Sequence, residues 1–515
     1  MKKFLVSLSL LLLVCSLQAY PTVKQPADPH PLSPNDAVKL AAADAATIQD
    51  VDIRYATRYL SLHNVPAADR AAYMQTIDFV LNSLSRRRAI SYGQAVNGSN
   101  GAVVRIFLDN YSITPAQFDD LAIRGSGPVR ISTKKDQGEE YFATRHGETK
   151  KVTKQRQKKD AQGRLLFYSP GTPQEQPAYE DYVEETKTFV GSWFDPAAML
   201  ALQAAVKSEY PIIRADWFIA NASLAPAYYE LLGIKTHADF TELVRYRERD
   251  YDLATKGIVV DSQEVSLHNR AILVTPTSLG RYWETFDYLT SQGNDNLLRD
   301  LLKRNRDAGE AFAEMPNGLQ AFLLIDSKDK VLDVADGNIV SDQTTPWRHK
   351  LVFGGLAQCT MCHVDGAKAV HEEVRLSTQP PFGLQIPASE KAKAKEVADL
   401  FFSGNIDEPL AFTRLVYRQR ISLATRGLTP EKNTAAFKKA FLDFWQKPLT
   451  LADAAAEVGC TPAEFTQVMG ALKAPAPEPG IATLLQGRSL RREIWTDGAY
   501  AQSATIMYQL HRVKP

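Results

Sequence analysis

Two cysteines and a histidine, close together in the second half of the chain, restrict their neighbourhood more than any other residues do. In GGLAQCTMCHVDG, Cys359 and Cys362 stand three positions apart, and His363 follows directly. On one helical turn, two thiols at this spacing can form thioether bonds with the two vinyl groups of a haem, and the adjacent imidazole can bind the iron. The motif predicts one covalently attached haem c with His363 as an axial iron ligand.

The same cysteines fit two other kinds of site. Half of a zinc site would need two more ligands, which Cys460 or scattered histidines would have to supply. A redox-active Cys-x-x-Cys pair would fit a βαβ pattern, and no such pattern is apparent around Cys359. Haem is the preferred interpretation because an exported chain reaches the compartment where haem c is attached.

The first residues have the pattern of an export signal. Lys2 and Lys3 precede an apolar run from Phe4 to Val14, and Ala19 supplies a small residue for cleavage. The run is too short to span about 30 Å of hydrocarbon. We therefore expect a signal peptide over residues 1–19 and a periplasmic protein.

Cys15 offers an alternative end to this leader. LLVC resembles a lipoprotein box, although Val14 stands where a small residue is usual. A lipid anchor on Cys15 is the minor hypothesis, and cleavage after Ala19 is preferred.

Charge and hydropathy exclude some partners. The chain has 60 Lys and Arg against 59 Asp and Glu, so its net charge of +1 gives no field for nucleic acid. After the leader, no apolar run is long enough to predict a transmembrane segment. The 515 residues suggest two to four domains.

The residue pattern divides the chain into regions. Prolines predict an extended linker over 20–35, and periodic apolar residues predict helices over 36–85. Strands are expected over 102–109, 257–267 and 270–276, and a β-hairpin should turn at Ser327-Lys328-Asp329. We expect an α+β region over 36–345, of unknown role, followed by a mainly α-helical cytochrome c-like haem domain over 346–515. One of its helices should begin at Thr461, with Glu464 completing the cap.

A charged insert interrupts the α+β region over residues 130–164. From 131 to 164 there are ten Lys or Arg against five Asp or Glu, with few apolar residues. It could dock an acidic partner, but a solvated hairpin or a disordered insert is the preferred interpretation.

No residue is a clear sixth ligand for the iron. The only methionines after Met361 are Met469, on an apolar helical stripe that favours a core role, and Met507. His371 is too close to His363 in sequence to reach the opposite face of the haem, and His349 is expected to be a surface residue. The distal ligand is left unassigned.

The chain resembles the large monohaem cytochrome c-like proteins of planctomycete-type bacteria. The matching stretches are RYLSLHNVP, FVLNSLS, PIIRADWFIANASLAPAYYELLG, VSLHNRAI, YWETFDYLTSQGNDNLLRD, EMPNGLQAFLLID and VFGGLAQCTMCHVDG, spread from Asp52 to Gly366. Thr360 stands where the family usually has serine. The resemblance implies haem attachment and electron transfer, and it implies no substrate.

Two functions compete. In the first, the haem relays single electrons to a redox partner protein that the sequence does not identify. In the second, the protein is a haem-dependent oxidoreductase of peroxidase type, or a haem-based sensor, and the upstream region forms a pocket. Arg214-Ala215-Asp216-Trp217 and His268-Asn269-Arg270 could line such a pocket, although structural ion pairs are the simpler interpretation. Electron transfer is the preferred function.

Overall fold

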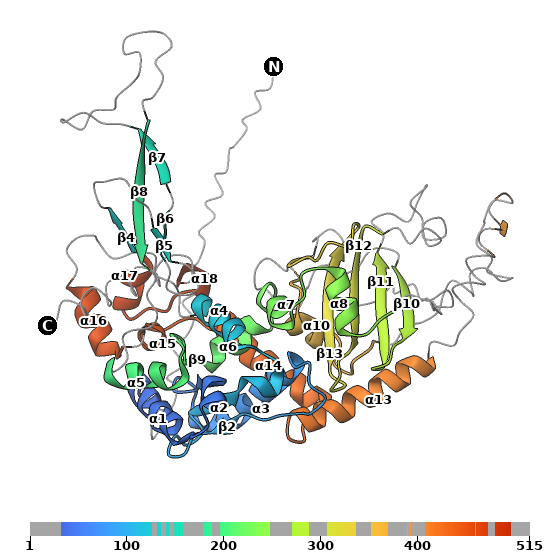
Figure 1. Ribbon diagram of the computed structural model, residues 1–515, viewed down its shortest axis with the longest axis horizontal. Coiled ribbons are helices and arrows are strands. Elements are labelled where there is room, and N and C mark those ends of the chain that lie inside the picture. Colours follow the sequence, from blue (N-terminus) through green and yellow to red (C-terminus); the bar gives the residue numbers. More distant parts are fainter. Residues whose placement is uncertain are drawn as a thin grey trace, which may run out of the picture.

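The computed structural model describes residues 32–125, 131–134, 141–143, 149–151, 153–157, 179–187, 196–247, 270–287, 306–335, 352–368, 389, 391–392, 395, 407–458, 460–471 and 479–495. Within them, helices and strands are mixed, as the sequence predicts (Figure 1). The predicted signal peptide, Cys15 and the strand predicted over 257–267 lie outside the described residues. No helix in the described part is long and apolar enough to cross a membrane.

The first sheet has the strand order β2-β3-β1-β9. Its strand β1 (Thr57–Ser61) pairs antiparallel with β3 (Val103–Phe107) and parallel with β9 (Ile212–Arg214). β2 (Gln94–Ala95) forms the edge beside β3. β3 confirms the strand predicted over 102–109.

Helices cover both faces of this sheet. Tyr59 of β1 shares a core cluster with α1 (Pro34–Thr47) and α5 (Pro196–Val206), while Leu60 belongs to the main core. Successive side chains of a strand point to opposite faces, so β1 is buried on both sides. The helix predicted over these residues was wrong at β1, because a strand buried on both faces lacks the alternation that identifies strands.

The second sheet is an antiparallel meander. It consists of β10 (Arg270–Pro276), β11 (Arg281–Asp287), β12 (Ala308–Glu314) and β13 (Gln320–Asp326), paired in chain order. β10 confirms the strand predicted over 270–276.

The chain reverses directly after β13, as predicted. Ile325 pairs with Val331, the N–H of Asp326 donates to the Lys330 carbonyl at 3.0 Å, and Asp329 has a φ of 61°. Asp tolerates this left-handed conformation better than most residues do.

The elements described after residue 352 are mostly helices. They are α10 (Leu356–Cys362), α13 (Asp407–Ala424), α14 (Pro430–Trp445), α15 (Leu451–Glu457), α16 (Pro462–Gly470), α17 (Pro479–Leu485) and α18 (Arg492–Ile494). Thr461 and Glu464 form the predicted capping box at the start of α16. The remaining helices are α2 (Val51–Tyr55), α3 (Arg70–Ser83), α4 (Pro115–Gly125), α6 (Ala215–Ala222), α7 (Ala227–Leu232) and α8 (His237–Leu243), with 3₁₀ turns at Ala67–Asp69 and Leu108–Tyr111.

One hydrophobic core joins the two regions that the sequence separates at residue 345. Leu60 of the first sheet and Phe322 of the second belong to the same buried cluster as Leu356 of α10, Tyr417 of α13 and Phe444 of α14. α14 packs against both α3 and α6. Helices α10, α13 and α14 therefore share their core with the α+β region, while α15, α16 and α17 pack in a second cluster of their own.

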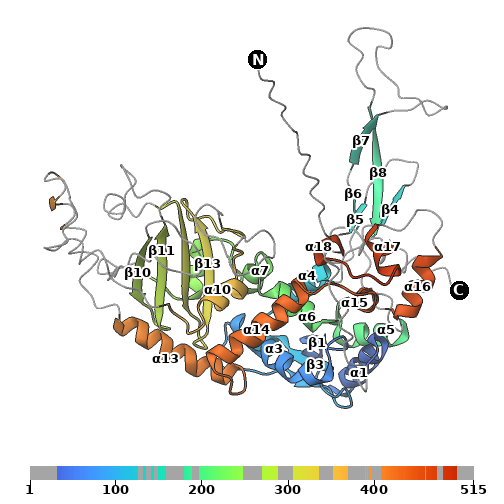
Figure 2. The same cartoon turned by 180° about the vertical axis from the view of Figure 1, so that it is seen from behind.

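The described parts of the charged insert are strands. β4 (Ile131–Lys134) and β7 (Thr153–Gln157) both pair antiparallel with β8 (Tyr179–Lys187), which follows the insert. β5 (Tyr141–Ala143) pairs with β6 (Thr149–Lys151). This sheet projects away from the rest of the protein (Figures 1 and 2).

Candidate functional site

The helix that carries both cysteines starts at two glycines. Gly355 has a φ of 116°, a region that other residues rarely enter. A Cβ on Gly354 would lie 2.2 Å from Tyr229 Oη, and one on Gly355 would lie 2.7 Å from the Ser223 carbonyl oxygen. The same carbonyl accepts the N–H of Ala357 at 3.0 Å. The start of α10 is thus fixed against the turn between α6 and α7.

Cys359 and Cys362 are half-buried, while Leu356, Ala357 and Thr360 of the same helix are buried. Side chains three positions apart lie on the same side of a helix. The two thiols therefore share one side of α10, and the buried residues anchor that helix in the main core. This arrangement suits a group held along the side of α10 that carries the thiols.

His363 ends α10, and its ring orientation is fixed by the next turn. Its N–H donates to the Cys359 carbonyl at 2.7 Å, and its Nδ1 lies 3.2 Å from the Gly366 carbonyl oxygen. Because a carbonyl can only accept, this bond puts the imidazole proton on Nδ1. Nε2 then carries the lone pair that a metal ion needs, as is usual for iron-binding histidines.

A row of aromatic side chains from the second sheet meets the imidazole. Trp283, Phe312 and Phe322 stand directly opposite one another on β11, β12 and β13. The rings of Trp283 and Phe312 are stacked, with 5.7 Å between their centroids. The centroid of the His363 ring lies 5.0 Å from that of Phe312 and 5.9 Å from that of Phe322. The Cys-x-x-Cys-His motif is therefore seated on an apolar sheet face of the upstream region.

α13 covers the turn after His363. A Cβ on Gly366, whose φ is 87°, would lie 2.8 Å from the Tyr417 side chain, and Arg414 Nε donates to the Ala367 carbonyl at 2.8 Å. Burial raises the pKa of Tyr417, so this phenol stays neutral. The carbonyl that orients His363 is held between α10 and α13.

A buried acid completes the sheet face. Trp283 Nε1 donates to Thr413 Oγ1 at 3.3 Å, and both Thr413 and the nearby Glu314 are fully buried. Burial raises the pKa of Glu314, against the effect of the Arg281 N–H that donates to it at 2.6 Å. The raised pKa means that this carboxyl takes up a proton more readily than an exposed glutamate does.

These supporting residues were not predicted from the sequence. Along each strand, successive side chains point to opposite faces of the sheet. This period of two could have shown which residues of β11 share a face with Trp283, and which residues of β12 share a face with Phe312. Their meeting with His363, and that of Tyr417 with Gly366, depends on contacts between distant segments, which one sequence does not reveal.

The structure separates Met469 from the motif. Met469 is fully buried in a second cluster with Phe465 and Trp495, whereas Met361 packs against the main core. α16, which carries Met469, lies on the far side of α6 from α10 in both views (Figures 1 and 2). This agrees with the core role favoured for Met469. Met507, His349 and His371 lie outside the described residues.

Cys460 lies in the same second cluster as Met469, and burial raises the pKa of its thiol to about 12. It behaves as the buried small residue that the sequence suggests. Among the described residues, no three His, Cys, Asp or Glu side chains gather in a way that could hold a metal ion.

Arg214 and Asp216 form the predicted ion pair, at 2.5 Å between Nη2 and Oδ2. Burial alone would raise the pKa of Asp216, but Arg214 and the Asn64 amide hold it below its usual range. The Trp217 N–H also donates to this carboxylate at 2.8 Å. The ion pair is thus confirmed, and it lines a pocket.

This pocket is remote from the cysteines. Its walls include α15, which lies across α6 from α10 in both views (Figures 1 and 2). Arg270 begins β10, and His268 and Asn269 lie outside the described residues. The structure does not bring Arg214 and Asp216 to His363.

No family model, curated protein or solved structure gives a significant match to this chain.

Proposed function

We propose that this protein is an exported monohaem cytochrome c that transfers electrons through a haem attached to Cys359 and Cys362. One observation carries the proposal: the two half-buried thiols lie on one helical turn, followed by a histidine whose Nδ1 faces the Gly366 carbonyl. That tautomer suits iron ligation through Nε2. The bound haem would supply one-electron chemistry.

The chain's own residues would hold and shield this group. α10 would present the thiols, Gly366 would orient His363, and the row of Trp283, Phe312 and Phe322 would exclude water beside the imidazole. An apolar surrounding is one of the means by which a protein adjusts the potential of haem iron.

The haem site would be composite. The region 346–515 contributes α10 and α13, while the aromatic row comes from β11, β12 and β13 of the upstream region. The cytochrome c-like helical domain inferred from sequence is therefore proposed in a modified form, with the meander as one wall. Export to the periplasm belongs to the same proposal, because haem c is attached outside the cytoplasm.

The spin state of the purified haem protein tests the choice between relay and enzyme. An electron carrier keeps two strong axial ligands, so we expect a mainly low-spin spectrum in both redox states and slow, weak binding of carbon monoxide. A high-spin ferrous protein that binds carbon monoxide rapidly would favour a peroxidase-like enzyme or a sensor instead. Asn97→Ala, at an exposed position outside α10 and the aromatic row, is the control and should leave the spectrum unchanged.

A further inference from the structure

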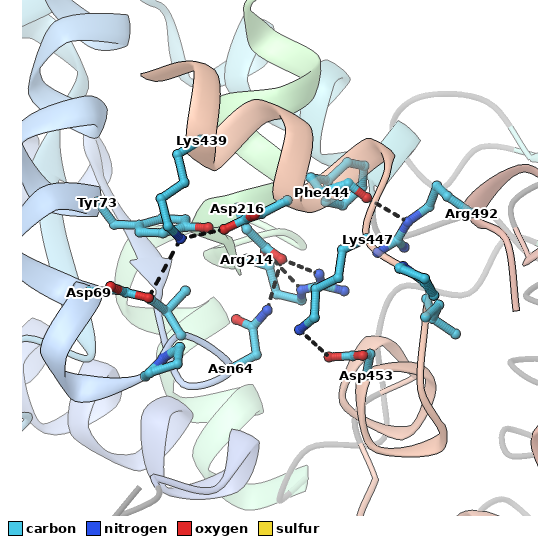
Figure 3. A pocket seen from close by; sticks show the side chains of 15 residues that line it. Asn64, Asp69, Tyr73, Arg214, Asp216, Lys439, Phe444, Lys447, Asp453 and Arg492 are labelled. Atoms are coloured by element: carbon cyan, nitrogen blue, oxygen red, sulfur yellow. Dashed lines mark hydrogen bonds and ion pairs between the residues drawn. The ribbon is translucent and has the colours of Figure 1, made fainter. Parts of the chain in front are cut away.

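The pocket beside Arg214 has a volume of about 290 Å³, at the lower end of the range for small-molecule sites. It lies between the start of α3, the β9–α6 junction, the end of α14, α15 and α18 (Figure 3). Segments from both ends of the described chain thus form one cavity. Neither its position nor its lining involves the cysteine motif.

The inner wall is a closed network of charges. Arg214 bonds to Asp216, and its Nη1 lies 2.8 Å from Glu457 Oε1. Arg492 also pairs with Glu457, and its Nε donates to the Phe444 carbonyl at 3.0 Å. Two guanidinium groups and two carboxylates balance each other here. A charged ligand would have to break a buried pair, which is costly.

The mouth is balanced in the same way. Lys439 Nζ lies 2.6 Å from Asp443 Oδ2 and 3.7 Å from Asp69 Oδ2. Lys447 Nζ lies 3.8 Å from Asp453 Oδ1. Four basic and four acidic residues line the whole pocket, so it offers no net field to an ion. The donors and acceptors nevertheless lie side by side around it (Figure 3).

Two neutral polar groups are suited to a ligand. Asn64 donates its amide N–H to Asp216 at 2.8 Å, while its Oδ1 is buried and has no hydrogen-bond partner among the described residues. Burial raises the pKa of Tyr73, so its hydroxyl keeps its proton. A buried amide oxygen without a partner is costly, so it favours a bound group that donates to it.

We propose that this pocket binds a small, neutral, polyhydroxylated molecule of the monosaccharide class. A hydroxyl both donates and accepts, so it can bridge a lysine and a carboxylate without breaking either ion pair. Val65, Pro66, Phe444 and Leu449 provide apolar wall for the C–H groups of such a ring. The site is independent of the proposed electron transfer.

Saturation-transfer NMR on the full-length protein, followed by calorimetry, tests this site. The neutral probes are D-glucose, D-galactose, N-acetylglucosamine and myo-inositol, and the charged probes are phosphate, succinate and putrescine. We expect saturable binding of at least one neutral probe. Asn64→Ala and Tyr73→Phe should each raise its Kd about tenfold, the size of one lost hydrogen bond. Asn97→Ala, at an exposed position outside the pocket, should not change it.

Three results would overturn the proposal. The first is the absence of saturable binding for all four neutral probes. The second is a neutral probe whose Kd is unaffected by Asn64→Ala and Tyr73→Phe. The third is binding of a charged probe alone that is lost in those variants, since this would show an ion site.

Discussion

At the scale of single residues, the candidate haem site depends on groups outside the Cys-x-x-Cys-His motif. His363 is oriented by the carbonyl of Gly366. Gly366 has a φ of 87° and lies close to Tyr417, a position where only a residue without a side chain fits easily. The tautomer of the imidazole is thus decided by a turn that α13 holds in place. Changing that turn should alter the orientation of His363, the proposed iron ligand, without removing it.

Gly366→Ala tests this dependence against a matched control. Gly427→Ala also places a side chain at positive φ (105°) but meets nothing within 4 Å. Each substitution should cost about 1 kcal/mol of unfolding free energy through its backbone conformation. Only Gly366→Ala should lose further stability and shift the Soret band, because its Cβ displaces Tyr417 or the turn. Indistinguishable spectra for the two variants would contradict the role of Gly366.

His63 gives the protein a specific acid sensitivity. Burial, assisted by the nearby Arg214, lowers the pKa of His63 from 6.5 to about 4, and its Nδ1 lies 2.7 Å from Ser61 Oγ. Between these pH values the unfolded chain binds the proton first, so stability falls as pH drops from 6.5 towards 4.

His63→Gln should therefore lose less stability than the wild type over that window. The measurement is the change in Tm between pH 7 and pH 5 for both proteins. An equal or larger drop in the variant would show that His63 does not contribute to the acid limb.

At the scale of elements, the sheet formed by β4 to β8 stands apart from the structure that holds the motif. Its strands pair with one another and project from the body (Figures 1 and 2). Deletion of 131–164 alone would leave β8 (Tyr179–Lys187) without the strands it pairs with. Removal of 131–187 is therefore the sharper experiment.

The deletion of 131–187 should leave soluble protein with an unchanged haem spectrum and a Tm within a few degrees of the wild type, because these strands pair with one another in a sheet that projects from the body. Thermal unfolding and visible spectra check this. Insoluble protein, or a spectrum that changes, would show that the sheet supports the body after all.

Local patterns predicted elements well where neighbouring residues decide them. The capping box of Thr461 and Glu464, the strand over 270–276 and the reversal at 327–329 all depend on a few adjacent residues. β1 was missed because its pairing with β9 joins residues about 150 positions apart (Tyr59 and Ile212). Because β1 is buried on both faces, it also lacks the alternation of apolar and polar residues that would have indicated a strand.

At the scale of the whole molecule, the motif was predictable and its setting was not. Cys359, Cys362 and His363 are identified by spacing alone, but the aromatic row against His363 is built from three strands far upstream. The spacing of residues along one sequence does not predict contacts between segments that are far apart in the chain. The same holds for the core that joins residues on both sides of position 345.

The central claim is covalent haem attachment, and haem staining of the denatured polypeptide tests it most directly. The protein should be expressed with its leader in cells that attach haem c, denatured, separated by electrophoresis and stained for peroxidase activity before and after acid–acetone extraction. Thioether bonds predict a stained band that survives extraction, is lost in the Cys359→Ala, Cys362→Ala double variant, and persists in Cys460→Ala. Colour that is removed completely by extraction, or staining that is equal in the double variant, would contradict the claim.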